Sequence, residues 1–94
     1  MRDFNEPEPV RIPINGILDL HAFSPRDAAS VVDEFIRACR EKGVYEVRII
    51  HGKGTGALRR IVHAVLVRHH LVKTYGLDTG PSGWGATLVQ LEEE

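Results

Sequence analysis

The chain has 94 residues, of which 43% are hydrophobic and 27% are charged. This length and composition suit one compact globular domain and exclude two separate cores. The formal net charge is −1, which taken alone argues against a nucleic-acid-binding protein.

The charge is unevenly distributed along the sequence. Residues 1–8 carry a net charge of −2 and residues 92–94 carry −3, so residues 9–91 hold eleven basic and seven acidic side chains. No carboxylate occurs between Glu46 and Asp78, where six basic residues and four histidines lie. Because local potential governs association more than net charge does, we expect a phosphate-bearing partner.

Cysteine content and hydropathy indicate the cellular compartment in which the protein is expected. Cys39 is the only cysteine, so no disulfide can form within the chain, and we expect a reducing, cytoplasmic location. On a predicted helix, Cys39 is expected to be a small buried hydrophobe. The sequence has no signal peptide and no apolar run of about 18 residues, so no membrane association is expected.

The first half of the chain predicts one strand and one helix after a flexible arm at residues 1–13. Residues 10–14 overlap the end of this arm, and their side chains alternate between the two faces of an extended segment. They are expected to form an edge strand or an extended arm, because Pro13 lacks the N–H group that a central strand needs. Residues 17–20 predict a short, mostly buried strand. Ser24, Pro25 and Asp27 are typical of a helix start with a capping box. The helical spacing of the apolar residues that follow predicts one buried helix face: Ala28, Val31, Val32, Phe35, Ile36 and Cys39. Gly43 is typical of a helix end.

The second half predicts a strand at residues 44–50, a helix from Ala57, and strands at residues 71–77 and 84–91 around a turn. The last two strands are expected to pair antiparallel, and the first two core strands to be parallel. We predict an α/β fold: a two-layer sandwich of a mixed four-stranded sheet with two helices on one face, in the order (β)β-α-β-α-β-β. The domain would span residues 14–91, followed by an acidic tail at 92–94.

The loop at residues 51–56, His-Gly-Lys-Gly-Thr-Gly, is the strongest local signal. It joins a strand to a helix start, where backbone N–H groups and the helix dipole favour an anion. Its alternating glycines let a ligand approach the backbone closely. The order of glycines and lysine in this loop fits neither of the common nucleotide-binding motifs, G-x-x-x-x-G-K-[ST] and G-x-G-x-x-G, so no nucleotide cofactor is expected. The predicted phosphate-binding residues are Gly52, Lys53, Gly54, Gly56, Arg59 and Arg60.

Asp19 and His21 fall on one face of the first core strand. The carboxylate can orient the imidazole, or both groups can meet a phosphate, a water or a metal. In the alternative, Asp19 caps the adjacent loop and His21 bonds a backbone carbonyl. His51 ends the next strand and can donate to a phosphate or act as an acid or base, and we predict that these three residues converge on a substrate phosphate. A divalent cation, Mg²⁺ or Mn²⁺, held by Asp19 is an option that the sequence does not require.

Trp84, His69 and His70 are weaker candidates for a functional role. Trp84 lies between Gly83 and Gly85 and either stacks on a base or sugar or closes part of the core. His69 and His70 lie at a helix end, where a cation is favoured by the dipole, and solvated side chains are expected there.

Three motifs in order resemble the Smr (small MutS-related) domain family over residues 14–91: Leu18-Asp19-Leu20-His21, His51-Gly52-Lys53-Gly54 and Gly83-Trp84-Gly85-Ala86-Thr87. The resemblance implies a two-layer fold similar to the C-terminal domain of translation initiation factor three. It also implies nicking or structure-directed cleavage of DNA, or cleavage of RNA, as associated with MutS2 proteins and free-standing relatives.

Residue by residue, Asp19 and His21 match the family's L-D-x-H element, which is implicated in cleavage. His51, Gly52 and Gly54 match its [TH]-G-x-G element, which is implicated in substrate binding. The sequence departs from the family at Ala22, where glycine is common.

We therefore expect a nucleic-acid-binding domain, monomeric or weakly dimeric, with endonuclease activity in DNA repair, recombination or RNA processing. The alternative is a non-catalytic binder of branched or single-stranded nucleic acid. A third class, a small-molecule enzyme or sensor that holds a nucleotide or sugar phosphate, is disfavoured because so short a domain leaves little room for a deep pocket.

Overall fold

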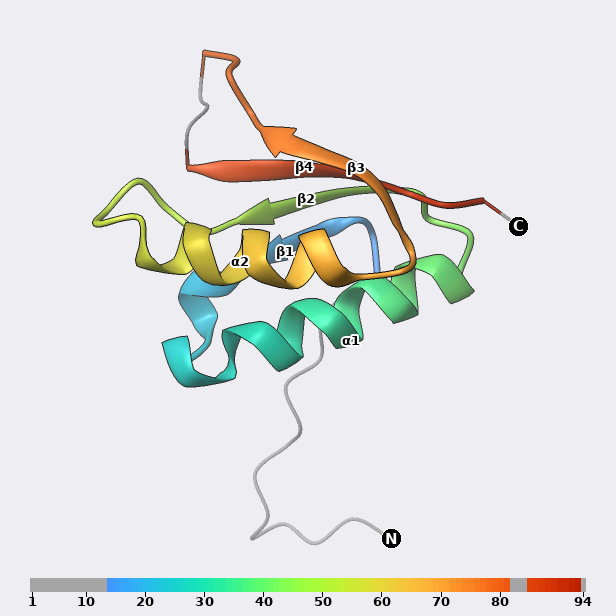
Figure 1. The fold of residues 1–94 in the computed structure, drawn as a ribbon, viewed down its shortest axis with the longest axis horizontal. Helices are drawn as coiled ribbons and strands as arrows, with labels where there is room; N and C mark the ends of the chain where they lie inside the picture. The colour runs from blue at the N-terminus through green and yellow to red at the C-terminus, as the bar shows by residue number, and fades with distance from the viewer. Residues whose placement is uncertain (1–13, 82–84, 94) are drawn as a thin grey trace, which may run out of the picture.

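The computed structural model describes residues 14–81 and 85–93, which form a four-stranded sheet with two helices against one face (Figure 1). The elements in chain order, with η marking short 3₁₀ helices, are β1 (Ile17–Asp19), η1 (Leu20–Ala22), η2 (Pro25–Asp27), α1 (Ala28–Glu41), β2 (Glu46–Ile50), α2 (Ala57–Arg68), β3 (Val72–Leu77) and β4 (Ala86–Leu91). The predicted two-layer α/β sandwich is confirmed. Neither helix in these ranges combines the length and apolarity needed to cross a bilayer.

The strands lie in the order β1-β2-β4-β3. β1 and β2 are parallel, as predicted for strands joined through a helix, and β3 and β4 are antiparallel, as predicted for the final pair. The sequence did not predict that β4 also pairs antiparallel with β2. The last strand is thus central, and four of its six residues are buried: Ala86, Thr87, Val89 and Leu91.

The core lies between the sheet and the helices. α1 buries the predicted apolar face except Val31, which packs against the core while partly exposed. α2 buries Val62 and Leu66. Each fully buried aliphatic side chain contributes about 1.5–3 kcal/mol. Cys39 is inside this core, as predicted, and burial raises the pKa of its thiol.

The start of α1 differs from the prediction. Residues Pro25–Asp27 form a 3₁₀ turn, and the side chains of Ser24 and Asp27 make no capping hydrogen bond in the described structure. The N–H of Asp27 instead donates to the carbonyl of Ser24 at 2.9 Å. The tighter turn bonds backbone to backbone, which takes the place of the side-chain cap. Residues 10–13 of the predicted edge strand lie outside the described residues, and Ile14 packs against the core.

A buried histidine ties the end of α2 to α1. The His69 side chain is 5% exposed, and its Nε2 donates to Oδ1 of Asp33 at 2.8 Å. Its Nδ1 accepts from the N–H of Leu71 at 3.2 Å. Arg37 donates to the same Asp33 oxygen at 3.0 Å. The prediction of a solvated His69 is therefore wrong, because this side chain turns inward to a carboxylate on the neighbouring helix.

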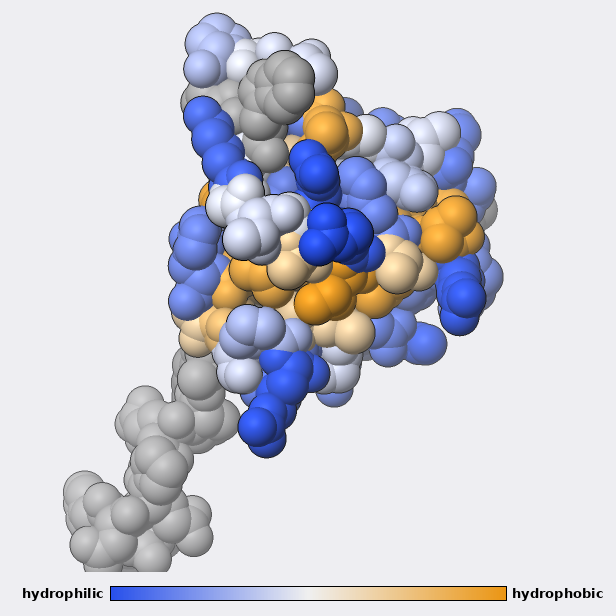
Figure 2. All heavy atoms as spheres, turned by 60° about the vertical axis from the view of Figure 1, so that its left-hand side comes forward, coloured by the Kyte–Doolittle hydropathy of each residue, from blue (hydrophilic) through white to orange (hydrophobic). Residues whose placement is uncertain are grey.

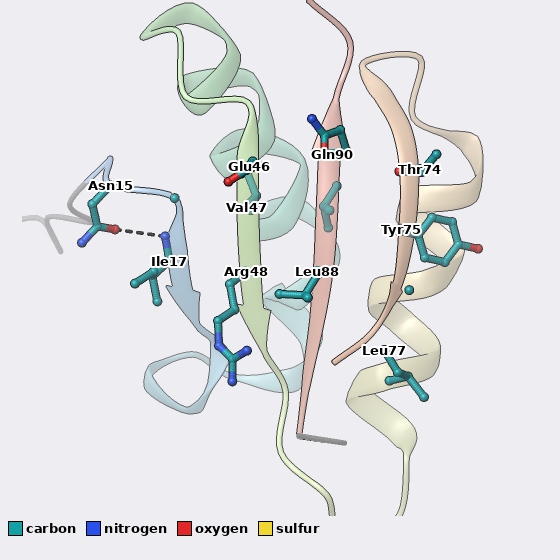
Figure 3. A pocket seen from close by; sticks show the side chains of 13 residues that line it. Asn15, Ile17, Glu46, Val47, Arg48, Thr74, Tyr75, Leu77, Leu88 and Gln90 are labelled. Atoms are coloured by element: carbon teal, nitrogen blue, oxygen red, sulfur yellow. Dashed lines mark hydrogen bonds between the residues drawn. The ribbon is translucent and has the colours of Figure 1, made fainter. Parts of the chain in front are cut away.

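The face of the sheet opposite the helices is a shallow hollow lined by all four strands (Figure 3). Ile17 and Leu88 stand on this face with 50% and 46% of their surface exposed. Arg48 lies between them in the paired strands and donates to the Asp78 carboxylate at the end of β3. That hydrogen bond lowers the pKa of Asp78 and fastens the start of the β3–β4 loop to β2.

The hydrogen bonds from Arg37 and His69 to Asp33 predict how the stability of the fold changes at acidic pH. Burial alone would raise the pKa of Asp33, but the hydrogen bonds from Arg37 and His69 outweigh it, and the pKa lies below its ordinary value. A carboxyl group of this kind stabilises the fold above its unfolded pKa and loses that contribution as the pH falls through its folded pKa. The free energy of unfolding should decrease as the pH falls below about 4. The decrease should be less steep in Asp33→Asn, because the amide does not titrate. Urea denaturation at several acidic pH values measures both slopes, and identical slopes would contradict the assignment.

Candidate active site

Asp19 and His21 meet at the carboxyl end of β1. The Asp19 Oδ1 accepts from the His21 backbone N–H at 2.9 Å and from Nδ1 of the same imidazole at 2.7 Å. The strand was predicted to continue to Leu20, but it ends at Asp19 because this carboxylate caps the 3₁₀ turn. The backbone N–H of His21 lowers the pKa of Asp19, burial opposes this, and the imidazole lowers it further. Both interpretations of the pair are thus partly realised: Asp19 caps the turn and also orients the imidazole.

This contact fixes the tautomer of a neutral His21. An ionised carboxylate only accepts, so Nδ1 carries the proton and Nε2 keeps a lone pair. The Nε2 atom lies against Gly52, where an added Cβ would be only 2.9 Å away. The basic nitrogen of His21 therefore faces the glycine loop that follows β2.

The backbone of Gly52 is also held by Gly85. The N–H groups of His51 and Gly52 both donate to the Gly85 carbonyl, at 2.9 and 2.8 Å. An added Cβ on Gly85 would be 3.5 Å from Cγ of Lys53 and 3.6 Å from Cα of Gly52. Gly52 has a φ of +81°, which other residues rarely adopt. The expectation that its amide holds a phosphate is not met, since that amide bonds to Gly85.

His51 does not join the Asp19–His21 pair. It is 4% exposed. Its Nδ1 is 3.0 Å from the Gly52 carbonyl and its Nε2 is 2.9 Å from Oγ1 of Thr87. Asp19 is paired with Ile50 in the sheet, and the next side chain along β2 turns to the opposite face. The prediction placed the three residues at adjacent strand ends correctly but took no account of the face on which each side chain lies.

Thr87 and His63 are the site residues that sequence reasoning missed. Oγ1 of Thr87 lies 2.8 Å from Nε2 of His63 in α2, so it joins two imidazoles while being fully buried. The sequence did contain a sign that Thr87 has a buried partner. Thr87 shares the inward face of a strand with Val89 and Leu91, and a polar residue on a buried face needs a partner.

The predicted cations gather where α2 begins. An added Cβ on Gly56, the residue before α2, would be 3.1 Å from a guanidinium nitrogen of Arg59 and 3.5 Å from one of Arg60. Lys53 is exposed in the same loop. Within residues 14–81 and 85–93, no hydrogen bond takes up the amides of residues 53–56. Hydrophilic side chains surround a smaller apolar area at this end of the molecule (Figure 2). Trp84 lies outside the described residues.

A resident metal ion has little to hold it here. Asp19 and His21 are two potential ligands, and Oδ1 of Asp19 is already bonded to His21. In the described part of the chain, no group of three or more His, Cys, Asp or Glu side chains is placed to hold a metal. These residues therefore do not fit a metal cage built from protein ligands.

A family model for the Smr domain matches residues 18–92, most of the chain. The chain belongs to the Smr domain family. Endonuclease MutS2 of Brevibacillus brevis is 40% identical over 76 residues, and that of Clostridium tetani is 38% identical over 76 residues. Each match covers 80% of this chain but 10% of the relative, so this Smr domain spans about a tenth of the length of these MutS2 proteins.

Solved structures agree with this assignment. The crystal structure of the Smr domain of Thermus thermophilus MutS2 superposes with a TM-score of 0.74 at 35% identity, covering 81% of this chain and 96% of that one. YdaL, a stand-alone small MutS-related protein from Escherichia coli, superposes with a TM-score of 0.77 at 28% identity, covering 86% and 67%. The resemblance inferred from the three motifs is confirmed.

Gly52 and Gly54 offer a matched test of the site's geometry. Gly52→Ala forces a side chain into the left-handed region and against His21, so we expect a loss of about 1–3 kcal/mol in the free energy of unfolding. Gly54 has no positive φ and nothing within 4 Å of an added Cβ, so Gly54→Ala should be neutral or stabilise by up to about 1 kcal/mol. Urea denaturation measures stability, and NMR of the His21 ring reports its displacement. Equal effects of both substitutions would contradict the close approach at Gly52.

Proposed function

We propose that this Smr domain binds nucleic acid at the carboxyl ends of β1 and β2 and cleaves its phosphodiester backbone, with His21 as the general base. The observation that carries the proposal is the His21 imidazole, oriented by Asp19, with Nε2 turned to the glycine loop. The names of the relatives, endonuclease MutS2, support the same activity.

Binding is assigned to the loop amides and the nearby cations. The amides of Lys53, Gly54 and Gly56 and the positive end of α2 favour a phosphate, as helix N-termini do generally. The side chains of Lys53, Arg59 and Arg60 add positive charge beside them. These contacts lie along the backbone of the ligand, so they give affinity and register but not sequence specificity.

Cleavage follows from the position of Nε2. A water molecule beside it gives up a proton to Nε2 as its oxygen attacks the phosphorus, and the bond from phosphorus to the leaving oxygen breaks as that oxygen takes a proton from solvent. Asp19 stabilises the imidazolium that forms. Lys53 neutralises charge that develops on the phosphate. In RNA the same base is suited to the ribose 2′-hydroxyl.

The optional divalent cation becomes a narrower proposal. Since Asp19 and His21 do not make a metal cage, we propose that any dependence on Mg²⁺ or Mn²⁺ reflects ions carried by the substrate phosphates. The catalytic steps assigned to His21 and Asp19 do not depend on such an ion.

A non-catalytic nucleic-acid binder is the second candidate, and one observation favours it. Only the His21 imidazole is placed to act on a ligand at the glycine loop, because both ring nitrogens of His51 bond within the protein. A single base without a second acid is a weaker catalyst than the convergent set expected from the sequence.

Cleavage assays on matched DNA and RNA substrates separate the two candidates. His21→Ala should reduce the cleavage rate by about 10²–10⁴-fold, the usual effect of removing a general base. Asp19→Asn should also reduce it, since it disturbs the tautomer. His70→Ala is the control, because His70 is an exposed histidine beyond the opposite end of α2. Cleavage by His21→Ala at the wild-type rate would refute the assignment, and intact substrate with wild-type protein would favour the binder.

Binding is tested through its salt dependence. Lys53→Ala and Arg59→Ala should each weaken binding to an oligonucleotide and reduce the slope of log K against log salt by about 0.7–0.9 per lost phosphate contact. Lys42→Ala, an exposed lysine at the far end of α1 (Figure 1), removes the same charge elsewhere and should leave the slope unchanged. Gel shifts at several salt concentrations give the slopes. Equal slopes for Lys53→Ala and Lys42→Ala would place the binding surface elsewhere.

A further inference from the structure

A chain of polar contacts runs through the buried side of the site, behind the Asp19–His21 pair. It begins at the Gly52 carbonyl, 3.0 Å from Nδ1 of His51, and continues from Nε2 of His51 to Oγ1 of Thr87 at 2.9 Å. From Thr87 it reaches Nε2 of His63 at 2.8 Å. β4 and α2 are thereby connected, through the residue that follows β2, to one peptide group of the glycine loop.

The chemistry of the groups fixes the direction of these hydrogen bonds. A carbonyl only accepts, so Nδ1 of His51 must donate to Gly52. A neutral imidazole has one N–H, so Nε2 of His51 accepts and the Thr87 hydroxyl donates to it. The hydroxyl oxygen then accepts from Nε2–H of His63. Every donor along the chain thus has an acceptor, with each proton pointing toward Gly52.

Neutral histidines are what the surroundings favour. Burial lowers the pKa of His63, and the positive charge of nearby Arg59 lowers it further. His51 is 4% exposed, and in the described part of the chain no carboxylate pairs with it. A charge on His51 would therefore be buried without compensation, which is costly.

The chain holds a peptide group and does not deliver a proton. It ends at a backbone carbonyl, which accepts a hydrogen bond without taking up the proton, and His51 faces away from the Asp19–His21 pair. What it sets is the orientation of the Gly52 peptide, and Gly52 is the residue against which Nε2 of His21 lies. Gly85, the residue before β4, holds the same point twice, since its carbonyl accepts from the amides of His51 and Gly52.

We infer that Thr87 and His63 are positioning residues, which act through His51 and Gly52 to hold the surface on which the His21 imidazole and the scissile phosphate meet. The catalytic part of this inference rests on the proposed function. Loss of the hydroxyl leaves His51 and His63 without their shared partner, so the loop can shift, and small misplacements at a reacting centre are expensive in rate.

Ring-nitrogen NMR tests the inference without any cleavage assay. His51 should be the Nδ1–H tautomer and His63 the Nε2–H tautomer in the wild-type protein. Thr87→Val keeps the shape of the side chain and removes the hydroxyl, and it should move the ring signals of His21. Thr87→Ser keeps the hydroxyl and should leave them unchanged. An Nε2–H tautomer at His51, or His21 signals that ignore Thr87→Val, would overturn the inference.

Cleavage kinetics give the second readout. Thr87→Val should lower kcat by about ten- to hundredfold while the Kd for an uncleaved oligonucleotide stays within about threefold of wild type. His63→Ala, which removes only the last link, should have a smaller effect, and Thr87→Ser should restore kcat. A folded Thr87→Val protein with wild-type kcat would overturn the inference.

The two readouts separate failure of this inference from failure of the proposed function. If Thr87→Val does not fold, as judged by thermal melting, His63→Ala decides, and unchanged His21 signals in that variant would overturn the inference. If the wild-type protein does not cleave, the proposed nuclease activity fails, while the NMR experiment still supports or overturns the positioning role.

Discussion

The site depends on a close approach at Gly52. The His21 imidazole lies where a side chain of this residue would be, the Gly85 carbonyl holds its amide, and its φ is +81°. The His21 ring and the positive φ leave no room for a side chain on Gly52. Segments from β1, β2 and β4 are brought together there, so the basic nitrogen of His21, the stem of Lys53 and the start of α2 have fixed relations to one another.

Positive potential at this point comes from fewer residues than the sequence suggests. Arg48 belongs to the stretch without carboxylates, yet it bonds Asp78 across the open face of the sheet. Lys53, Arg59 and Arg60 remain near the loop and the N-terminus of α2. The acidic residues at the chain ends dominate the net charge, but the interaction between charges falls with distance and is screened over about 10 Å, so the local arrangement decides what the surface attracts.

The histidines show how one residue type serves different purposes in one small domain. His21 is exposed and oriented by a carboxylate, which suits acid–base chemistry. His51 and His63 share a buried hydroxyl, and His69 joins two helices through Asp33. Buried imidazoles need partners for their ring nitrogens. Two of the histidines, His51 and His63, therefore hold the loop that the His21 ring faces, while His69 holds the two helices together.

The sequence by itself determined the order and type of the elements, the parallel first pair of strands, the apolar face of α1, and the family. These depend on local periodicity, turn residues and motifs, which can be recognised in each segment without knowing its distant partners. It also placed Asp19, His21 and the glycine loop at neighbouring strand ends. Only the tertiary structure decided that β4 enters the middle of the sheet, that His51 turns inward to Thr87, and that Arg48 is neutralised by Asp78. Each of these outcomes depends on contacts between residues about 30 or more positions apart, and no local pattern specifies which distant partner a strand edge or a buried polar group will find.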